Sequence, residues 1–199
     1  MLKLYSARSA ERILQRRSGG IEAIAERYGL PAACLRAILY KELTDIDLLD
    51  IVADTLVRFN QRRLDKPVHG GGFLQKCDSS TGYGQIFAFV AIDAVNFAAD
   101  RGITDYAALG LPDDHRLDAG SMADLRLVWG RLHTDPVFNI ACTALNLLAA
   151  AQEMTGRIDF AGCTPEELKL VFTRYNGNFK DVSPYGEAVY AIYLRFSGA

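Results

Sequence analysis

The segment from Pro136 to Met154 (PVFNIACTALNLLAAAQEM) constrains the fold more than any other part of the chain. As a helix it carries apolar side chains on most of its faces, and such a helix has to be surrounded by protein. No run in the chain approaches the roughly 20 consecutive apolar residues of a membrane-spanning helix. We therefore expect a central buried helix with other elements packed around it, and no membrane span.

Helical spacing and capping signals recur along the rest of the chain. Apolar residues over 21–28 fall on one helix face that ends at Gly29, and Thr164 begins a capping box with proline at the first helical position. With the central segment, the expected helices cover 21–28, 31–42, 46–63, 86–100, 121–133, 164–175 and 183–193. We predict one mostly α domain over residues 1–199, with about eight helices and at most a marginal sheet.

Two stretches lack this periodicity. Residues 66–84 (KPVHGGGFLQKCDSSTGYG) are rich in glycine and small polar side chains, which is typical of a loop with room for a short hairpin. Residues 102–120 read as an irregular connection.

Charge and cysteine content exclude several classes of function. The 22 basic and 24 acidic residues give a formal charge of −2, which argues against a nucleic-acid binder that relies on a basic face. The four cysteines have no CxxC spacing, so we expect no zinc site and favour free thiols. Residues 113–115 (DDH) are best explained as surface charge in a loop. We expect neither a metal nor a cofactor.

Glu42 has an unusual position. It falls in register with the apolar residues Leu35, Ile38 and Leu39, at the end of the helix predicted over 31–42. Burial and the negative end of a helix dipole both raise the pKa of a carboxyl group. Acid-catalysed cleavage of a glycosidic bond requires a carboxyl that stays protonated near neutral pH. The alternative is that the helix ends one residue earlier and Glu42 reaches water.

Several short motifs occur in a fixed order around this residue. They are IEAIAERYGLPAACLRAILYKE over 21–42, TGYGQI over 81–86, FNI over 138–140, RYNG over 174–177 and YGEAV over 185–189. In this order they resemble the lysozyme-like superfamily, specifically its lytic transglycosylase branch and the related goose-type lysozymes. The resemblance spans most of the chain, from Ile21 to Tyr193.

The resemblance implies a lysozyme-like fold that cleaves peptidoglycan between N-acetylmuramic acid and N-acetylglucosamine. Glu42 takes the place of the catalytic glutamate. The expected sugar-binding residues are Gly82, Tyr83, Gly84, Gln85, Tyr175 and Asn176. Among these, the Tyr175 hydroxyl is expected to point at the Glu42 carboxyl. The two glycines would let sugar rings approach the backbone, which a Cβ atom would obstruct.

The chain departs from the family pattern at two places. Leu43 follows the glutamate, where the family usually has serine. The gap between Glu42 and Gln85 is longer than in the family, and we interpret residues 44–77 as an insertion beside the cleft. This inserted helix and glycine-rich loop would reshape substrate access or bind a partner.

A second acid would decide between two reactions. Asp78 precedes the cleft motif and is the first candidate, with Asp45 and Asp47 as rivals close to Glu42. A second carboxylate would support hydrolysis, as in a muramidase. Without one, the muramyl 6-hydroxyl would close on the anomeric carbon, as in a lytic transglycosylase. Asp78 is explained equally well by solvated turn chemistry, and a non-catalytic glycan-binding module is a further alternative.

The expected partner is the peptidoglycan glycan strand, met in the periplasm or on the extracellular cell wall. The first residues, MLKLYSARSAERILQRR, place arginines where a signal peptide has its apolar core. We therefore expect export by a non-classical route or release by lysis. A secretion apparatus, an immunity protein or a larger assembly would fit as additional partners.

Overall fold

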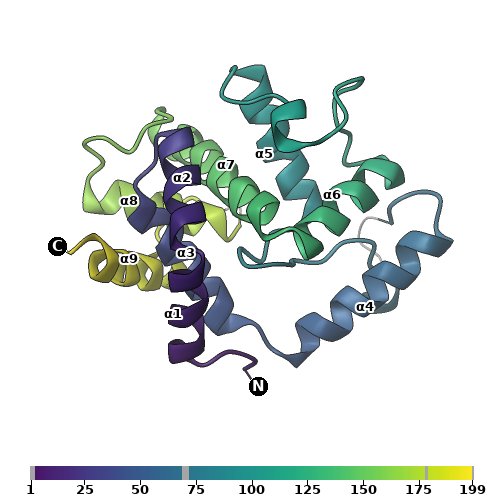
Figure 1. The fold of residues 1–199 in the computed structure, drawn as a ribbon, viewed down its shortest axis with the longest axis horizontal. Helices are drawn as coiled ribbons and strands as arrows, with labels where there is room; N and C mark the ends of the chain where they lie inside the picture. Colours follow the sequence, from purple (N-terminus) through teal and green to yellow (C-terminus); the bar gives the residue numbers. More distant parts are fainter. Residues whose placement is uncertain (1–2, 69–71, 178, 199) are drawn as a thin grey trace.

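The computed structural model describes residues 3–68, 72–177 and 179–198, and this part of the chain is mostly helical, as predicted. It contains nine α-helices, two short 3-10 helices and no strand within those ranges (Figure 1). The helices are α1 (Ala7–Arg16), α2 (Ser18–Tyr28), α3 (Ala32–Asp45), α4 (Leu48–Arg63), α5 (Ala88–Asp100), α6 (Met122–Thr134), α7 (Pro136–Thr155), α8 (Pro165–Tyr175) and α9 (Pro184–Ser197), with 3-10 helices η1 (Phe73–Gln75) and η2 (Ala107–Leu109).

The helix α7 lies at the centre, which confirms the prediction for Pro136–Met154. Asp135 caps it by accepting hydrogen bonds from the backbone of Val137 and Phe138, and Gly156 ends it with a φ of +74°. The helices α2, α5, α6 and α8 pack around it (Figure 1). Among the described helices α7 alone is long and apolar enough to cross a membrane, yet 72% of the segment concerned is buried inside the fold, as in the core helix of a globular domain.

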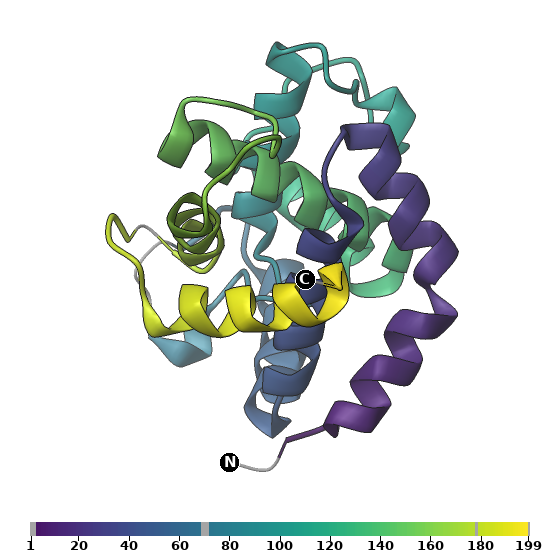
Figure 2. The ribbon, with the colours of Figure 1, turned by 90° about the vertical axis from the view of Figure 1, so that its left-hand side faces the viewer.

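The helix α1 was missed by the sequence prediction. Ser6 caps it through the backbone N–H of Ser9, but only Ala10 and Leu14 are buried, on α3. Two buried positions in ten residues make a weak periodic signal, so this helix owes its place to tertiary contact. The helix α9 lies across α3 (Figure 2), and its Arg195 forms an ion pair with Glu11 of α1 at 3.0 Å.

The predicted segment boundaries shift by a few residues. The helix α3 continues three residues beyond Glu42, to Asp45, so Glu42 lies in its last turn rather than at its last residue. The helices predicted from 46 and 86 begin at Leu48 and Ala88. The predicted glycine-rich loop contains η1, and its residues 69–71 lie outside the described part of the chain.

All four cysteines are free thiols, as favoured from the sequence. Cys34, Cys77 and Cys142 are buried and Cys163 is half-buried. In these positions they act as small core residues.

Candidate functional site

A cavity of about 680 Å³ opens where α3, α4, α8 and α9 meet the segment that precedes α5. Four of the predicted site residues line it, namely Glu42, Gln85, Tyr175 and Asn176. Asp78, Gly82, Tyr83 and Gly84 are not among its lining residues. The fold thus brings together residues that are up to 134 positions apart in the chain (42 to 176).

Glu42 contributes its carboxyl group to this cavity from the last turn of α3. Leu39, nearly one turn earlier in α3, and Leu43, the next residue, are both fully buried. Burial raises the pKa of Glu42 to about 7, whereas a hydrogen bond from Tyr185 and the charge of Lys41 lower it. Burial dominates, so the carboxyl is about half protonated at neutral pH.

The tyrosine that contacts Glu42 is Tyr185 rather than Tyr175. The Tyr185 hydroxyl donates a hydrogen bond to Glu42 Oε1. The Tyr175 hydroxyl donates instead to the carbonyl oxygen of Gly84, at 2.6 Å. The prediction for the Tyr175 hydroxyl was therefore wrong, although the residue does line the same cavity.

The local sequence of α9 explains how Tyr185 reaches the site. Ser183 caps the helix by accepting a hydrogen bond from the backbone of Gly186, and the Ser183 backbone donates to Thr173 Oγ1 at 3.0 Å. Gly186 packs against Thr173, where a Cβ atom would also approach the Lys169 carbonyl within 2.5 Å. This close approach of α9 to α8 puts the first turn of α9 beside Glu42. The Ser183-Pro184 start of the helix is the sequence signal that could have identified Tyr185.

Gly82 and Gly84 allow residues 76–87, which we call the cleft loop, to pack on α7. Gly82 has a φ of +73°, and a Cβ atom there would collide with the side chain of Asn139. A Cβ atom on Gly84 would collide with Thr143. These contacts lie on the α7 side of the loop, so both glycines are required for packing, and the expectation that they also make room for sugar stays a prediction.

Asn139 is the buried centre that holds this loop. Its Nδ2 donates to the carbonyl oxygens of Thr81 and Leu132, at 3.0 and 3.2 Å, and its Oδ1 accepts from the backbone of Gly84 at 2.8 Å. Both N–H donors and the amide oxygen of Asn139 are thus engaged inside the core. Asn139 therefore fixes the loop that carries Gln85.

Gln85 occupies the cavity side of this loop. Among the described residues it alone has a positive φ without being glycine, at 43°. Its Nε2 donates to the Gly82 carbonyl at 2.8 Å, and this bond holds the strained residue in place. Tyr83 points elsewhere, with the guanidinium of Arg17 6.0 Å from its ring centre.

Asp78 has a structural role at the start of α5. Its Oδ1 accepts a hydrogen bond from the backbone of Ala88 at 3.0 Å, and its Oδ2 accepts one from Phe89 at 2.9 Å. Burial raises the pKa of Asp78 to about 6, against the effect of these two bonds. Both carboxylate oxygens are thus engaged by a helix N-terminus.

The other carboxylates that line the cavity are engaged as well. Asp47 and Asp50 form the reciprocal capping box of α4. Asp45 forms ion pairs with Lys3 and Lys41. Among the described residues, no group of three or more histidine, cysteine or acidic side chains is placed to hold a metal ion.

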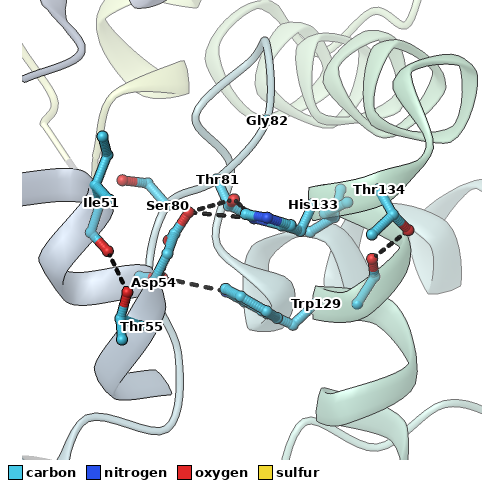
Figure 3. A network of polar contacts seen from close by, with 12 residues as sticks. Ile51, Asp54, Thr55, Ser80, Thr81, Gly82, Trp129, His133 and Thr134 are labelled. Atoms are coloured by element: carbon cyan, nitrogen blue, oxygen red, sulfur yellow. Dashed lines mark hydrogen bonds and ion pairs between the residues drawn. The ribbon is translucent and has the colours of Figure 1, made fainter. Parts of the chain in front are cut away.

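A polar network attaches α4 and α6 to the cleft loop (Figure 3). Thr81 Oγ1 lies 3.0 Å from Asp54 Oδ2 and 2.9 Å from His133 Nδ1. Ser79 donates to Asp54 at 2.7 Å and accepts from Trp129 Nε1 at 3.1 Å. The network joins α4, the cleft loop and α6, and the sequence did not indicate it.

Comparisons with protein-family models, with curated proteins and with solved structures find no match to this chain.

Proposed function

We propose that this chain cleaves the glycan strand of bacterial peptidoglycan, with Glu42 as the proton donor. The observation that carries the proposal is the state of this one carboxyl. It faces a cavity, it is desolvated so that its pKa is about 7, and a tyrosine hydroxyl orients it. A general acid works best when its pKa lies near the pH at which it operates.

The lining of the cavity suits a carbohydrate. Amide side chains of Gln85, Asn146 and Asn176 can donate to and accept from sugar hydroxyl and acetamido groups. Phe87 and Phe89 also line it, with ring centres 5.5 Å apart and exposed fractions of 36% and 42%. Exposed aromatic rings offer apolar faces to the C–H faces of pyranose rings.

The mechanism follows from a single acid. Protonated Glu42 gives its proton to the bridging oxygen as the bond from that oxygen to the muramyl anomeric carbon breaks. The muramyl 6-hydroxyl oxygen then bonds to the anomeric carbon, and its proton returns to ionised Glu42. The products are a strand ending in a 1,6-anhydro sugar and a new free 4-hydroxyl, with no water consumed. Glu42 ends the cycle in its starting state.

The other acids near the site already form hydrogen bonds or ion pairs within the protein, which favours this route over hydrolysis. A retaining or inverting hydrolase needs a second carboxylate for the nucleophile or for activating water. Asp78 caps α5, Asp47 and Asp50 cap α4, and Asp45 is paired with two lysines. The hydrolytic muramidase is the second candidate, because Asp45 lines the same cavity as Glu42.

Digestion of purified peptidoglycan tests the proposal. The released fragments are analysed by mass spectrometry, and we expect anhydro-muramyl ends that Glu42→Gln abolishes. The matched control is Glu26→Gln on the exposed side of α2, which should digest like the unmodified chain. Reducing muramyl ends would replace the transglycosylase by the muramidase. Unchanged digestion by Glu42→Gln would remove Glu42 from the mechanism. Binding of glycan without cleavage by the unmodified chain would leave a glycan-binding module.

The fold, the location and the macromolecular partners of the enzyme are also part of the proposal. A lysozyme-like arrangement of the helices, with residues 44–77 as an insertion, is part of the proposal. The enzyme would act in the periplasm or on the extracellular wall, after non-classical export or cell lysis. A secretion apparatus, an immunity protein or a larger assembly would be its macromolecular partner.

A further inference from the structure

The helix α4 carries most of its large apolar side chains on the outside, although Val57 is buried. Leu48, Leu49, Ile51, Val52 and Phe59 are between 47% and 57% exposed. Leu48, Val52 and Phe59 recur at helical spacing and form one stripe along the helix. An amphipathic surface helix normally turns such a stripe toward the core. In Figure 1, α4 runs along the edge of the molecule.

The polar side of α4 is the one that is held by the protein. Asn60 Nδ2 donates to the carbonyl oxygens of Leu74 and Lys76, and Gln61 Nε2 donates to that of Cys77, each at 2.9 Å. Asp54 is bound to Thr81 and Ser79 in the network of Figure 3. Rotating the helix to bury the apolar stripe would break all of these hydrogen bonds. These hydrogen bonds therefore fix the outward orientation of the helix. The stripe is left as an exposed apolar surface of the kind that marks an interaction site.

The two ends of α4 carry opposite charges. Asp45 and Asp50 lie at its beginning, where the Asp45 side chain is about half exposed, whereas the neighbouring Asp47 is buried. Arg58, Arg62 and Arg63 lie at its end, and none of the ion pairs between described residues includes them. Two such helices packed antiparallel would place the acidic end of each beside the basic end of the other, with the apolar stripes between them. A closed two-fold interface has this self-complementary form.

We propose that α4 is a homodimer interface, in which a second copy of this chain packs its own α4 antiparallel on the stripe. The two-fold axis passes near Thr55, midway along the exposed face, so that Val52 of each chain meets Phe59 of the other. The acidic beginning of the helix disfavours an anionic lipid surface as the occupant, because interfacial helices present basic residues to such a surface. Asp47 and Asp50 also line the cavity, so the second copy lies next to the cleft mouth.

Sedimentation of the full chain over a concentration series tests the interface. We expect a dimer whose dissociation constant rises by about 30-fold or more in Val52→Asp/Phe59→Asp. Circular dichroism should be unchanged, because both positions are exposed. The matched control is Val137→Asp, at a side chain 59% exposed on α7, which should leave the dimer intact. High salt and Arg62→Glu/Arg63→Glu should each weaken it by a smaller factor.

Cysteine cross-linking tests the antiparallel orientation, in a Cys163→Ser background that removes the half-buried thiol. Thr55→Cys should form a disulfide-linked dimer. Leu48→Cys should not, because the two copies of residue 48 would be about 20 Å apart along the helix axis. A monomer at every soluble concentration, or a dimer insensitive to the α4 substitutions, would overturn the proposal. So would stripe-dependent binding of a monomer to phosphatidylglycerol vesicles.

Discussion

Glu42 and Asp78 are two half-buried carboxyls whose surroundings raise their pKa values, to about 7 and about 6. They lie at opposite kinds of helix end. Glu42 is in the last turn of α3, where backbone carbonyl groups point outward, and its hydrogen-bond donor is one tyrosine hydroxyl. Asp78 faces the first turn of α5 and accepts two backbone N–H groups. The first carboxyl keeps an oxygen for a substrate, whereas the second has both oxygens engaged.

This difference separates a reactive acid from a structural one. A helix N-terminus supplies donors that a carboxylate satisfies, and the result is a cap. A helix C-terminus supplies no donor, so a carboxyl placed there depends on other elements and is protonated more easily. Substitution of these two acids is therefore expected to have different consequences, although both are acid candidates from the sequence.

The largest expected effect is on cleavage. Glu42→Gln should lower the rate of peptidoglycan digestion by about 100- to 10,000-fold, the range for losing a general acid. Asp78→Asn, corrected for the folded fraction, should digest at nearly the rate of the unmodified chain. Turbidity loss of purified cell walls measures both. Equal losses in the two variants would erase the distinction between the acids.

The second effect is on stability as a function of pH. A carboxyl with a raised pKa in the folded state stabilises the protein at low pH, and that contribution is lost as the pH rises through about 7. From pH 4 to pH 8 the unmodified chain should lose up to about 3 kcal/mol relative to Glu42→Gln. Urea unfolding of both proteins at several pH values gives the difference. A difference independent of pH would show that the Glu42 carboxyl titrates normally.

The third effect is on the free energy of unfolding, when the Asp78 cap of α5 is removed. Asp78→Ala leaves the first N–H groups of α5 without their acceptor and should cost about 2 kcal/mol of the free energy of unfolding at pH 7.5. Chemical denaturation measures the cost. The same substitution at the exposed Asp113 is the control and should be nearly neutral. A stable Asp78→Ala protein that has lost cleavage would make Asp78 the second catalytic acid.

The smallest effect distinguishes the two tyrosines. The Tyr185 hydrogen bond lowers the pKa of Glu42, so Tyr185→Phe should shift the alkaline limb of the pH–activity profile upward. Tyr175→Phe removes a bond to the Gly84 carbonyl and should leave that limb in place. Initial rates across the pH range measure the shift. An upward shift in Tyr175→Phe alone would restore the expectation drawn from the sequence.

Local features account for what could be predicted. Capping residues and apolar spacing act within a few residues, so eight of the nine described helices were expected within a few positions. The apolar character of α7 required it to be central. The register of Glu42 with Leu35, Ile38 and Leu39 indicated a desolvated acid, and burial is the main cause of its raised pKa.

Non-local contacts decided the rest. The choice of Tyr185 over Tyr175 depends on how closely α9 approaches α8, which Gly186 permits. The packing role of Gly82 and Gly84 depends on Asn139 and Thr143, more than 50 residues away in the chain.

The same limit applies to α4 and Asp78. A periodic stripe shows that a helix has an apolar face, but the partners of its polar face determine which way it turns, and here Asn60 and Gln61 turn the stripe outward. Asp78 became a cap because the fold brings the start of α5 to it. The sequence by itself determined where eight of the nine described helices form and that Glu42 is desolvated. Tertiary structure alone decided what each side chain contacts, because those hydrogen bonds join segments that only folding brings together.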